Sequence, residues 1–374
     1  MKIIQTPVRF PPYIGGTEKV TYYLSKELMK KGHEVKVICA DEPAVGSGRI
    51  DGIDVLRLPF VGKVANSNIT LALFNQLMKE NFDIMHTHLP HPWAADISAV
   101  VSKIKKKPLF LTYYNDIVGE GINKIVANMY NSIPLRFLLR QARKIFIIND
   151  NYIESSPFLK GFSNKVLVTH LGVDIEKYKP IKSARNSQGN NSIFFLSRLD
   201  KFHRYKGLEY LFLSVKKLLE KFPVKLYVGG AGELLDYYKD LARHNGIEIA
   251  VDFLGCLTDT QIVEYYNSCD VFVLPSISSA QEGFGMVALE AMACQKAVIV
   301  TEVVGVAAEV EKNSAGIIVE SRDVDSLSNA LERILSDKRL AREMGENAYR
   351  VATAKYTWKN YADAINREYL TIKQ

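Results

Sequence analysis

The chain has 374 residues, and 47% of them are hydrophobic, which is enough to build two α/β domains with separate cores. Its four cysteines have no paired spacing, so we expect reduced interior side chains and neither a disulfide framework nor a zinc site. No run of eighteen apolar residues occurs and no signal peptide precedes the first strand, which predicts a soluble, intracellular protein, at most peripheral to a membrane.

The net charge of +7 is unevenly distributed. The first 178 residues contain 23 Lys and Arg against 16 Asp and Glu, whereas the remainder contains 25 of each. A basic first half favours an anionic partner, such as lipid headgroups or a phosphorylated acceptor, and we expect no nucleic-acid partner. A basic surface that only keeps the protein soluble is an equally good interpretation.

The first half alternates predicted strands and helices. A strand at residues 2–7 leads into a loop with Gly15 and Gly16, and a helix begins near Thr17. These glycines would let the backbone approach a ligand at the end of the strand, although an ordinary tight turn also uses them. Further strands are predicted at residues 34–40, 53–59, 82–90, 108–116, 144–150 and 165–174.

The strand at residues 82–90 ends in His86 and His88, which share one face of a strand. With His91 they could hold a metal ion, but no Asp or Glu completes a ligand set, so we expect no metal. The favoured interpretation is a histidine pair in a substrate cleft.

Residues 123–144 mix apolar and cationic side chains, with Pro134 as an interruption. They predict an amphipathic helix that packs on the core. The alternative is a surface facing anionic lipid, formed together with the lysines of residues 102–108.

The polar residues 179–192 predict an interdomain linker. The next strand ends at Arg198, and a helix begins after Lys206. Two cations flanking a strand-to-helix loop suit a diphosphate, although solvated surface cations are the plain alternative. A later strand ends in Gly229 and Gly230, which would allow close approach of a nucleotide.

The stretch from residue 282 to 300 lies between two predicted strands and contains a helix that begins near Gly285. Its first N–H groups, at Phe284, Gly285 and Met286, have no partner within the helix and would stabilise an anion such as a diphosphate. Glu282 stands just ahead of the helix, within reach of a ligand hydroxyl. Glu290 lies in a helix that is apolar on nearly every side, so we expect it to be buried and to bind a ligand rather than to face solvent. Carboxylates that accept hydrogen bonds from hydroxyl groups are well suited to binding a sugar.

This pattern, Glu282-Gly283-Phe284-Gly285 with Glu290 eight positions after the first Glu, resembles the donor-site signature of the retaining glycosyltransferases of family 4. The resemblance covers almost the whole chain and implies an α/β protein of the GT-B fold, with two Rossmann-like domains whose parallel sheets face each other across a cleft. Residues 1–178 would form the acceptor-side domain, residues 193–356 would bind the nucleotide sugar, and a terminal helix at 357–374 would pack back on the first domain.

The resemblance also implies roles for individual residues. Arg198 and Lys206 would neutralise the leaving diphosphate, Glu282 would hold the donor sugar, and Glu290 would accept from the ribose hydroxyls. The other donor-binding residues would be Gly15, Gly16, Gly229, Gly230, Leu257, Gly283, Phe284, Gly285 and Met286. The acceptor side would include His86, His88 and Asp174.

Tyr114 is the largest departure from the family pattern. The family usually has Thr-Tyr-His-Asn-Asp, with the His at the reaction centre, where this chain has Tyr114 followed by Asn115 and Asp116. A phenol can hydrogen-bond a sugar or a transition-state oxygen but does not titrate near neutral pH as imidazole does. We expect Tyr114 and Asp116 at the catalytic centre.

The prediction is therefore a cytoplasmic retaining glycosyltransferase that needs no cofactor. It would move a hexosyl group from a UDP- or GDP-sugar to a hydroxyl of a glycan, lipid or polyol. Peripheral contact of the basic first domain with an anionic membrane is left open. The alternatives are a nucleotide-sugar epimerase or hydrolase with the same fold, and a non-catalytic nucleotide-sugar-binding protein, which the tyrosine at position 114 would explain.

Overall fold

A computed structural model describes residues 1–13, 15–64, 66–117, 122–148, 152–181, 191–279 and 281–373. They form two compact units: unit 1 comprises Met1–Leu171 and Trp358–Gln374, and unit 2 comprises Gly172–Thr357. The change of unit lies slightly before the expected boundary at residue 178. The reason is that Val173 N–H donates to Tyr356 O at 2.8 Å and the Tyr178 ring packs against Tyr266. Residues 182–190 of the predicted linker lie outside the described residues.

Unit 1 is built on an eight-stranded sheet that is parallel except for the edge strand β3. From one edge to the other its strands are β10 (Val166–Val168), β9 (Ala142–Ile147), β8 (Leu109–Tyr113), β7 (Ile84–Leu89), β1 (Lys2–Thr6), β2 (Glu34–Ala40), β4 (Ile53–Leu58) and β3 (Gly48–Ile50). The two-residue strands β5 (Lys63–Val64) and β6 (Ser67–Asn68) pair separately. Every residue of β7 is buried, as expected for a parallel strand covered by helices on both faces.

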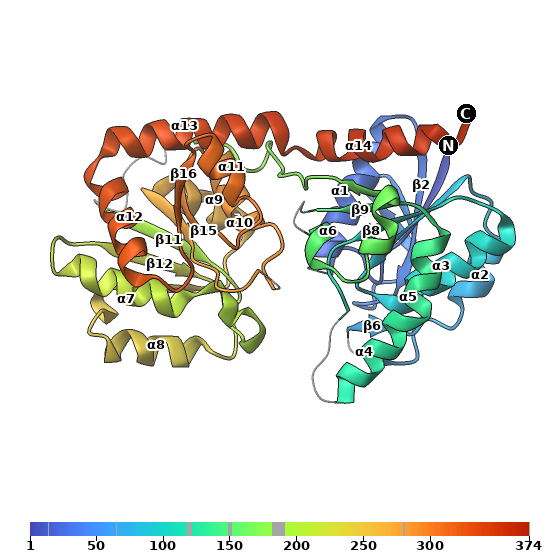
Figure 1. The fold of residues 1–374 in the computed structure, drawn as a ribbon, viewed down its shortest axis with the longest axis horizontal. Coiled ribbons are helices and arrows are strands. Elements are labelled where there is room, and N and C mark those ends of the chain that lie inside the picture. Colours follow the sequence, from blue (N-terminus) through green and yellow to red (C-terminus); the bar gives the residue numbers. More distant parts are fainter. Residues whose placement is uncertain are drawn as a thin grey trace. The chain divides into compact units, whose positions relative to one another are not determined.

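Helices cover this sheet, and the last one comes from the end of the chain (Figure 1). They are α1 (Gly16–Lys30), α2 (Leu73–Lys79), α3 (Pro92–Lys105), α4 (Ile122–Ser132), α5 (Pro134–Gln141), α6 (Tyr152–Ser155) and α14 (Trp358–Leu370), with 3-10 turns η1 (Lys160–Lys165) and η4 (Thr371–Lys373). Helix α14 is part of the core of unit 1, because Tyr361, Ile365 and Tyr369 are buried and the Trp358 ring stacks on Tyr23.

Unit 2 has a six-stranded parallel sheet in the order β13 (Val251–Gly255), β12 (Lys225–Gly229), β11 (Ser192–Leu196), β14 (Val271–Leu274), β15 (Ala297–Thr301) and β16 (Gly316–Val319). Its helices are α7 (Leu208–Leu219), α8 (Leu235–His244), α9 (Asp259–Ser268), α10 (Met286–Ala293), α11 (Ala307–Lys312), α12 (Val324–Ser336) and α13 (Lys338–Lys355), with 3-10 turns η2 (Lys201–Lys206) and η3 (Glu248–Ala250). The predicted α/β class is confirmed in both units.

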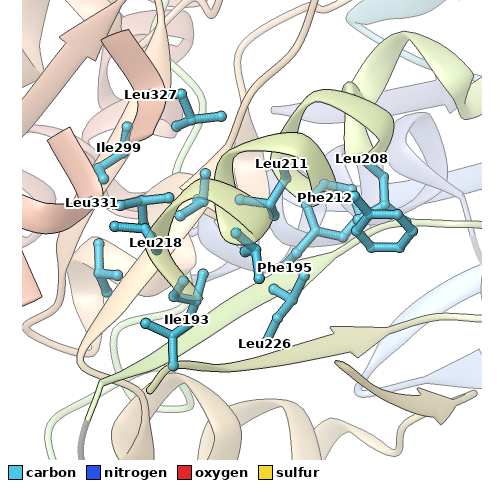
Figure 2. Close-up of a cluster of buried hydrophobic side chains, with 14 of the residues drawn as sticks. Ile193, Phe195, Leu208, Leu211, Phe212, Leu218, Leu226, Ile299, Leu327 and Leu331 are labelled. Carbon is cyan, nitrogen blue, oxygen red and sulfur yellow. The ribbon is translucent and has the colours of Figure 1, made fainter. Parts of the chain in front are cut away.

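The core of unit 2 forms where α7 lies on the sheet (Figure 2). Leu211, Phe212 and Leu218 of α7 point towards Ile193 and Phe195 of β11 in that view. With Leu208 and Val215 they recur every three to four residues, which places them on one side of the helix. This packing fixes α7, and with it the loop that carries the two predicted cations, against the central strand.

Both sheets have a point where the strand order reverses. In unit 2 the chain moves outward from β11 through β12 to β13, and the later strands β14 to β16 lie on the other side of β11. In unit 1 the same reversal separates β1 from β7. Ligands of such sheets bind beyond the carboxyl ends of the strands at this point.

Candidate active site

The reversal in unit 2 brings Lys206 and Glu282 into contact. The Lys206 Nζ lies 2.7 Å from the Glu282 Oε2, and Ser276 donates its hydroxyl to the same oxygen. Both side chains are almost out of water, with 13% and 4% exposed. Because a lysine has three N–H donors and Glu282 takes one, Lys206 has two further donors to offer. Two residues predicted for different parts of the donor thus form one ion pair.

Gly207 makes this contact possible. It adopts a left-handed conformation with φ of +76°, and a Cβ at this position would lie 1.9 Å from Pro275 O. The loop after β11 can therefore lie against the end of β14, where Ile277 N–H donates to Tyr205 O at 2.7 Å. This close approach places the start of α7 next to the Glu282 loop.

Arg198, which follows β11, is exposed and pairs with Asp200 at 3.0 Å. Asp200 also accepts the N–H groups of Phe202 and His203 at the start of η2. Burial would raise the pKa of Asp200, but the hydrogen bond and charge of His203, with the charge of Arg198, hold it below its ordinary value. The sequence analysis did not single out Asp200. The pattern that could have indicated it is an Asp at the N-cap of the turn between Arg198 and Lys206.

The glycines at the end of β12 allow the backbone to approach the loop that carries Arg198. A Cβ on Gly230 would lie 1.7 Å from Ser197 O, and one on Gly229 would lie 2.9 Å from the half-buried Leu257. Ser197 N–H donates to Gly229 O at 3.1 Å. These glycines therefore position the backbone just before Arg198. Contact of Gly229, Gly230 and Leu257 with a nucleotide stays a prediction.

Helix α10 begins as predicted, with Gly285 as its N-cap at φ of +83°. A Cβ there would lie 2.4 Å from Val304. Phe284 is buried against Tyr356, whereas Gly283 is exposed and Met286 half-buried. The turn that presents the first N–H groups of α10 is thus fixed by packing.

Glu290 is buried, as predicted, with 5% of the residue exposed. It accepts a hydrogen bond from the Tyr266 hydroxyl at 3.2 Å, and Tyr266 itself is fully buried. Burial and then the nearby Glu290 carboxylate raise the pKa of Tyr266 well above its ordinary value. A buried carboxylate needs a hydrogen-bond partner, and Tyr266 already supplies one to Glu290. The binding of a ribose by Glu290 therefore stays a prediction.

In unit 1 the loop after β1 leads to Gly15, the N-cap of α1, while Gly16 has open space around it. A Cβ on Gly15 would meet a carboxylate oxygen of Glu18 at 2.2 Å. Glu18 is buried and lies 3.4 Å from the guanidinium of the fully buried Arg9. Burial raises the pKa of Glu18 despite hydrogen bonds and the charge of Arg9. This ion pair beside Gly15 was not predicted, and an acidic residue in the first helical turn is its only local signal.

His86 and His88 are both completely buried, with their rings stacked 4.8 Å apart. His86 bonds to the hydroxyls of Tyr369 and Thr112 and is closed off from solvent, because α14 from the far end of the chain covers it. Its predicted place on the acceptor side stays a prediction. Burial lowers the pKa of His88 to about 3, so its imidazole is neutral at pH 7.

Tyr114 is half-buried, and its hydroxyl lies 3.3 Å from His88 Nδ1. On the other side of the ring, His88 Nε2 lies 3.0 Å from Gln5 Oε1, which can only accept. Nε2 therefore carries the proton, and Nδ1 accepts from the Tyr114 hydroxyl. Tyr361 is a further neighbour of the Tyr114 hydroxyl, and burial followed by this neighbour raises the pKa of Tyr114 well above its ordinary value.

Asp116 and Asp174 have partners within their own units. Asp116 Oδ1 accepts from the hydroxyls of Tyr113 and Ser156, both at 2.7 Å. Asp174, which lies in unit 2, accepts the N–H groups of residues 176 and 177 and fixes a turn. Their predicted catalytic and acceptor-side roles stay predictions.

Within the described ranges, no group of three or more His, Cys, Asp and Glu side chains is placed to hold a metal ion. No helix in the same part of the chain is both long and apolar enough to cross a bilayer.

Each of the two units is an α/β unit with a largely parallel sheet, and unit 2 carries a cation–carboxylate pair beside a helix N-terminus. These features define a protein of the GT-B class. The family model for glycosyl transferases group 1 matches residues 178–351, and the model for glycosyltransferase family 4 matches residues 14–177. The two models together span residues 14–351. The chain therefore belongs to the family 4 glycosyltransferases, which confirms the resemblance.

Several relatives are similar along nearly the whole chain. An uncharacterized glycosyltransferase of Methanocaldococcus jannaschii is 27% identical over 97% of this chain and 96% of its own. The phosphatidyl-myo-inositol mannosyltransferase of Mycolicibacterium smegmatis is 25% identical over 96% and 90%. The structure of Anabaena HepE in complex with UDP is 19% identical over 99% of this chain and 100% of its own, with a TM-score of 0.78. This similarity confirms the GT-B fold.

Proposed function

We propose that the protein transfers a hexosyl group from a UDP- or GDP-sugar to a hydroxyl of a glycan, lipid or polyol, with retention at the anomeric carbon. The observation that carries this proposal is the contact of Lys206 with Glu282 at the strand-order reversal of unit 2. Such a reversal is where α/β sheets bind nucleotides. The similarity to HepE, which has been crystallised with UDP, and to a mannosyltransferase supports the same reaction class.

The leaving diphosphate is stabilised by cations that are already in place. Glu282 holds Lys206, whose two remaining N–H groups bind phosphate oxygens. Arg198 can leave Asp200 at little cost, since the Arg198 side chain is 75% exposed and Asp200 keeps the N–H groups of Phe202 and His203. The N–H groups at the start of α10 add to the stabilisation as negative charge grows on the diphosphate.

Retention follows from attack on the face that the phosphate leaves. The acceptor oxygen forms its bond to the anomeric carbon as the bond from that carbon to the phosphate oxygen breaks. The acceptor proton passes to a phosphate oxygen, and the nucleoside diphosphate departs. Glu282 uses Oε2 for Lys206 and Ser276, which leaves Oε1 to accept from a hydroxyl of the donor sugar. Glu290 accepts from the ribose.

Tyr114 acts in this proposal as a hydrogen-bond acceptor. Its hydroxyl lies 3.3 Å from His88 Nδ1, and its oxygen receives a hydrogen bond from a substrate hydroxyl. The second candidate function, a nucleotide-sugar-binding protein that does not catalyse transfer, is favoured by the same contact, since the phenol is partly engaged within unit 1. It predicts donor binding without release of nucleoside diphosphate.

The proposal assigns charge neutralisation to Lys206 and Arg198, so transfer should persist in EDTA. It also places the protein in the cytoplasm, with peripheral contact with an anionic membrane through unit 1.

The test begins with binding. Purified protein is screened for thermal stabilisation by UDP, GDP and their hexoses, and the nucleotide that binds is then used with a panel of hydroxyl acceptors while nucleoside diphosphate release is followed. We expect stabilisation by one nucleotide class and its loss in Glu290→Gln. Product analysis without acceptor separates transfer from epimerisation and hydrolysis. If no nucleotide binds, or if Glu290→Gln binds as well as the wild type, the proposed donor site is wrong.

A further inference from the structure

The positive charge of the protein is concentrated in the segment that forms α3, α4 and α5. Residues 92–148 contain nine Lys and Arg against three Asp and Glu, an excess of six in a chain whose net charge is +7. Two of the three acids have partners, because Asp96 accepts from Tyr130 and Asp116 accepts from Tyr113. Some cations are also engaged: Lys105 donates to the backbone of α2, and Arg143 donates to Thr371 O. The exposed cations that remain are Lys103, Lys106, Lys124, Arg136 and Arg140.

Apolar side chains are exposed along α4 and at its junction with α5. Ile125, Val126, Met129 and Ile133 are 62%, 53%, 69% and 75% exposed. Ile125 and Met129 are four residues apart and share a face of the helix. The opposite side of α4 is the one that packs, since Ala127 and Asn131 are buried. We call these four residues the α4 ridge. Four adjacent exposed apolar side chains are unfavourable in water and mark an interaction surface.

The cations adjoin this ridge. Arg136 and Arg140 are four residues apart on α5, directly after Ile133, and they line a hollow of about 350 Å³ with Pro157, Phe158, Gly161 and Phe162. Lys103 of α3 lies 5.3 Å from the ring of Phe137 on α5, so the charge continues onto the neighbouring helix. Figure 1 shows α3, α4 and α5 together in unit 1. An apolar ridge bordered by arginines matches a bilayer, where acyl chains and phosphates lie a few ångströms apart.

We propose that α3, α4 and α5 form a docking surface for an anionic lipid bilayer, in which the α4 ridge enters the interface and Arg136 and Arg140 bind lipid phosphates. Nucleic acid would match the cations but has no counterpart for the ridge. The inference rests on the membrane contact of the proposed function and not on the transfer reaction, so the two can fail separately.

The experiment measures cosedimentation of the full chain with extruded vesicles. Vesicles of equal parts phosphatidylglycerol and phosphatidylcholine are compared with pure phosphatidylcholine, at low salt and at 0.5 M NaCl. We expect binding only to the anionic vesicles, weakened by salt because surface charges are screened. Removal of one arginine should lower the partition coefficient about 5-fold, and Arg136→Gln with Arg140→Gln about 25-fold.

A matched control exists on unit 2. Lys239 and Arg243 are also four residues apart on an exposed helix, α8, and also line a surface hollow. Lys239→Gln with Arg243→Gln should leave vesicle binding unchanged. Met129→Ser with Ile133→Ser should abolish the binding that persists at 0.5 M NaCl. Tryptophan fluorescence checks that unit 1 is folded, since Trp93 and Trp358, the two tryptophans, both lie there.

The proposal is overturned if the wild type does not bind anionic vesicles, or if the α5 and α8 variants lower binding equally, which would indicate non-specific charge attraction. It is also overturned if the wild type is a dimer that Met129→Ser converts to a monomer, since the ridge would then bind a second copy. Nucleotide stabilisation of the same variants reads out the donor site independently.

Discussion

Lys206 and Glu282 form a 2.7 Å ion pair in which both side chains are largely withdrawn from water. The pair joins the loop after β11 to the loop after β14, so it belongs to the architecture of unit 2 as well as to the donor site. Buried pairs of this kind respond asymmetrically: loss of one partner leaves an uncompensated charge, whereas replacement of both can be neutral.

Lys206→Ala should therefore abolish transfer and also destabilise unit 2, by about 3–5 kcal/mol, because the Glu282 carboxylate is left buried without its cation. The double variant Lys206→Met with Glu282→Gln should recover most of that stability without recovering activity. Urea unfolding followed by circular dichroism, together with a transfer assay, checks both statements. A Lys206→Ala protein as stable as the wild type would contradict the structural role of the pair.

Arg198 offers a cleaner test of diphosphate stabilisation. Its side chain is 75% exposed, so Arg198→Ala should change stability by less than about 1 kcal/mol. Its loss should lower kcat about 10²–10³-fold if it stabilises charge in the transition state. Lys201→Ala is the control, since Lys201 lies in the same loop, is 74% exposed and pairs only weakly with Glu233 at 3.9 Å. Equal effects of the two variants would remove Arg198 from the site.

Gly230→Ala should move the Arg198 loop. The new Cβ would lie 1.7 Å from Ser197 O, and backbone atoms must shift to admit it. Gly246→Ala is the control, because Gly246 also has a positive φ but no heavy atom within 4 Å of the added Cβ. Gly246→Ala should cost only the conformational penalty of about 1 kcal/mol and retain activity, whereas Gly230→Ala should lose more stability and most of the turnover. Calorimetric melting and the transfer assay decide between them.

Unit 1 should lose stability on mild acidification. Burial lowers the pKa of His88 to about 3 and of His91 to about 4, and that of His86 well below its ordinary value. Below about pH 6.5 the histidines are protonated in the unfolded chain but remain neutral in the folded chain. The free energy of unfolding therefore decreases as the pH drops below about 6.5. Asp96 and Glu18 act in the opposite direction, since burial raises the pKa of both, that of Asp96 to about 7, and the stability they contribute is lost as the pH rises through these values. The three histidines outweigh these two carboxyl groups.

The His91→Asn variant measures how much one of these histidines contributes to the pH dependence of stability. His91 is the N-cap of α3 and makes no side-chain cap, and asparagine is a good capping residue, so the variant should fold. The slope of unfolding free energy against pH, between pH 5 and 6, should decrease by up to about 1.4 kcal/mol per pH unit. Urea titrations read by tryptophan fluorescence report unit 1 specifically. An unchanged slope would mean that His91 is protonated in the folded state.

Local patterns in the sequence were sufficient for much of this fold. Unbroken apolar strands predicted the parallel sheets, and the glycine before Met286 predicted the start of α10. The burial of Glu290 followed from the small apolar residues around it. Each of these features depends on residues within about one helix length.

The features that were missed depend on long-range contacts. Lys206 and Glu282 are 76 positions apart, and no local pattern indicates that they form a pair. The contact that closes off His86 was also missed, because its partner Tyr369 lies 283 positions away. The antiparallel strand β3 at the edge of the first sheet was also missed, because three mostly exposed residues carry no periodicity.

The position of α14 in the core of unit 1 sets the order of events during synthesis. A ribosome releases all of unit 2 before the residues that contain Tyr361 and Tyr369 emerge, so the first-made half of the polypeptide must wait, with part of its interior uncovered, for its final helix. A protein truncated after Thr357 should therefore carry a protease-sensitive amino-terminal half, whereas its unit 2 should be folded.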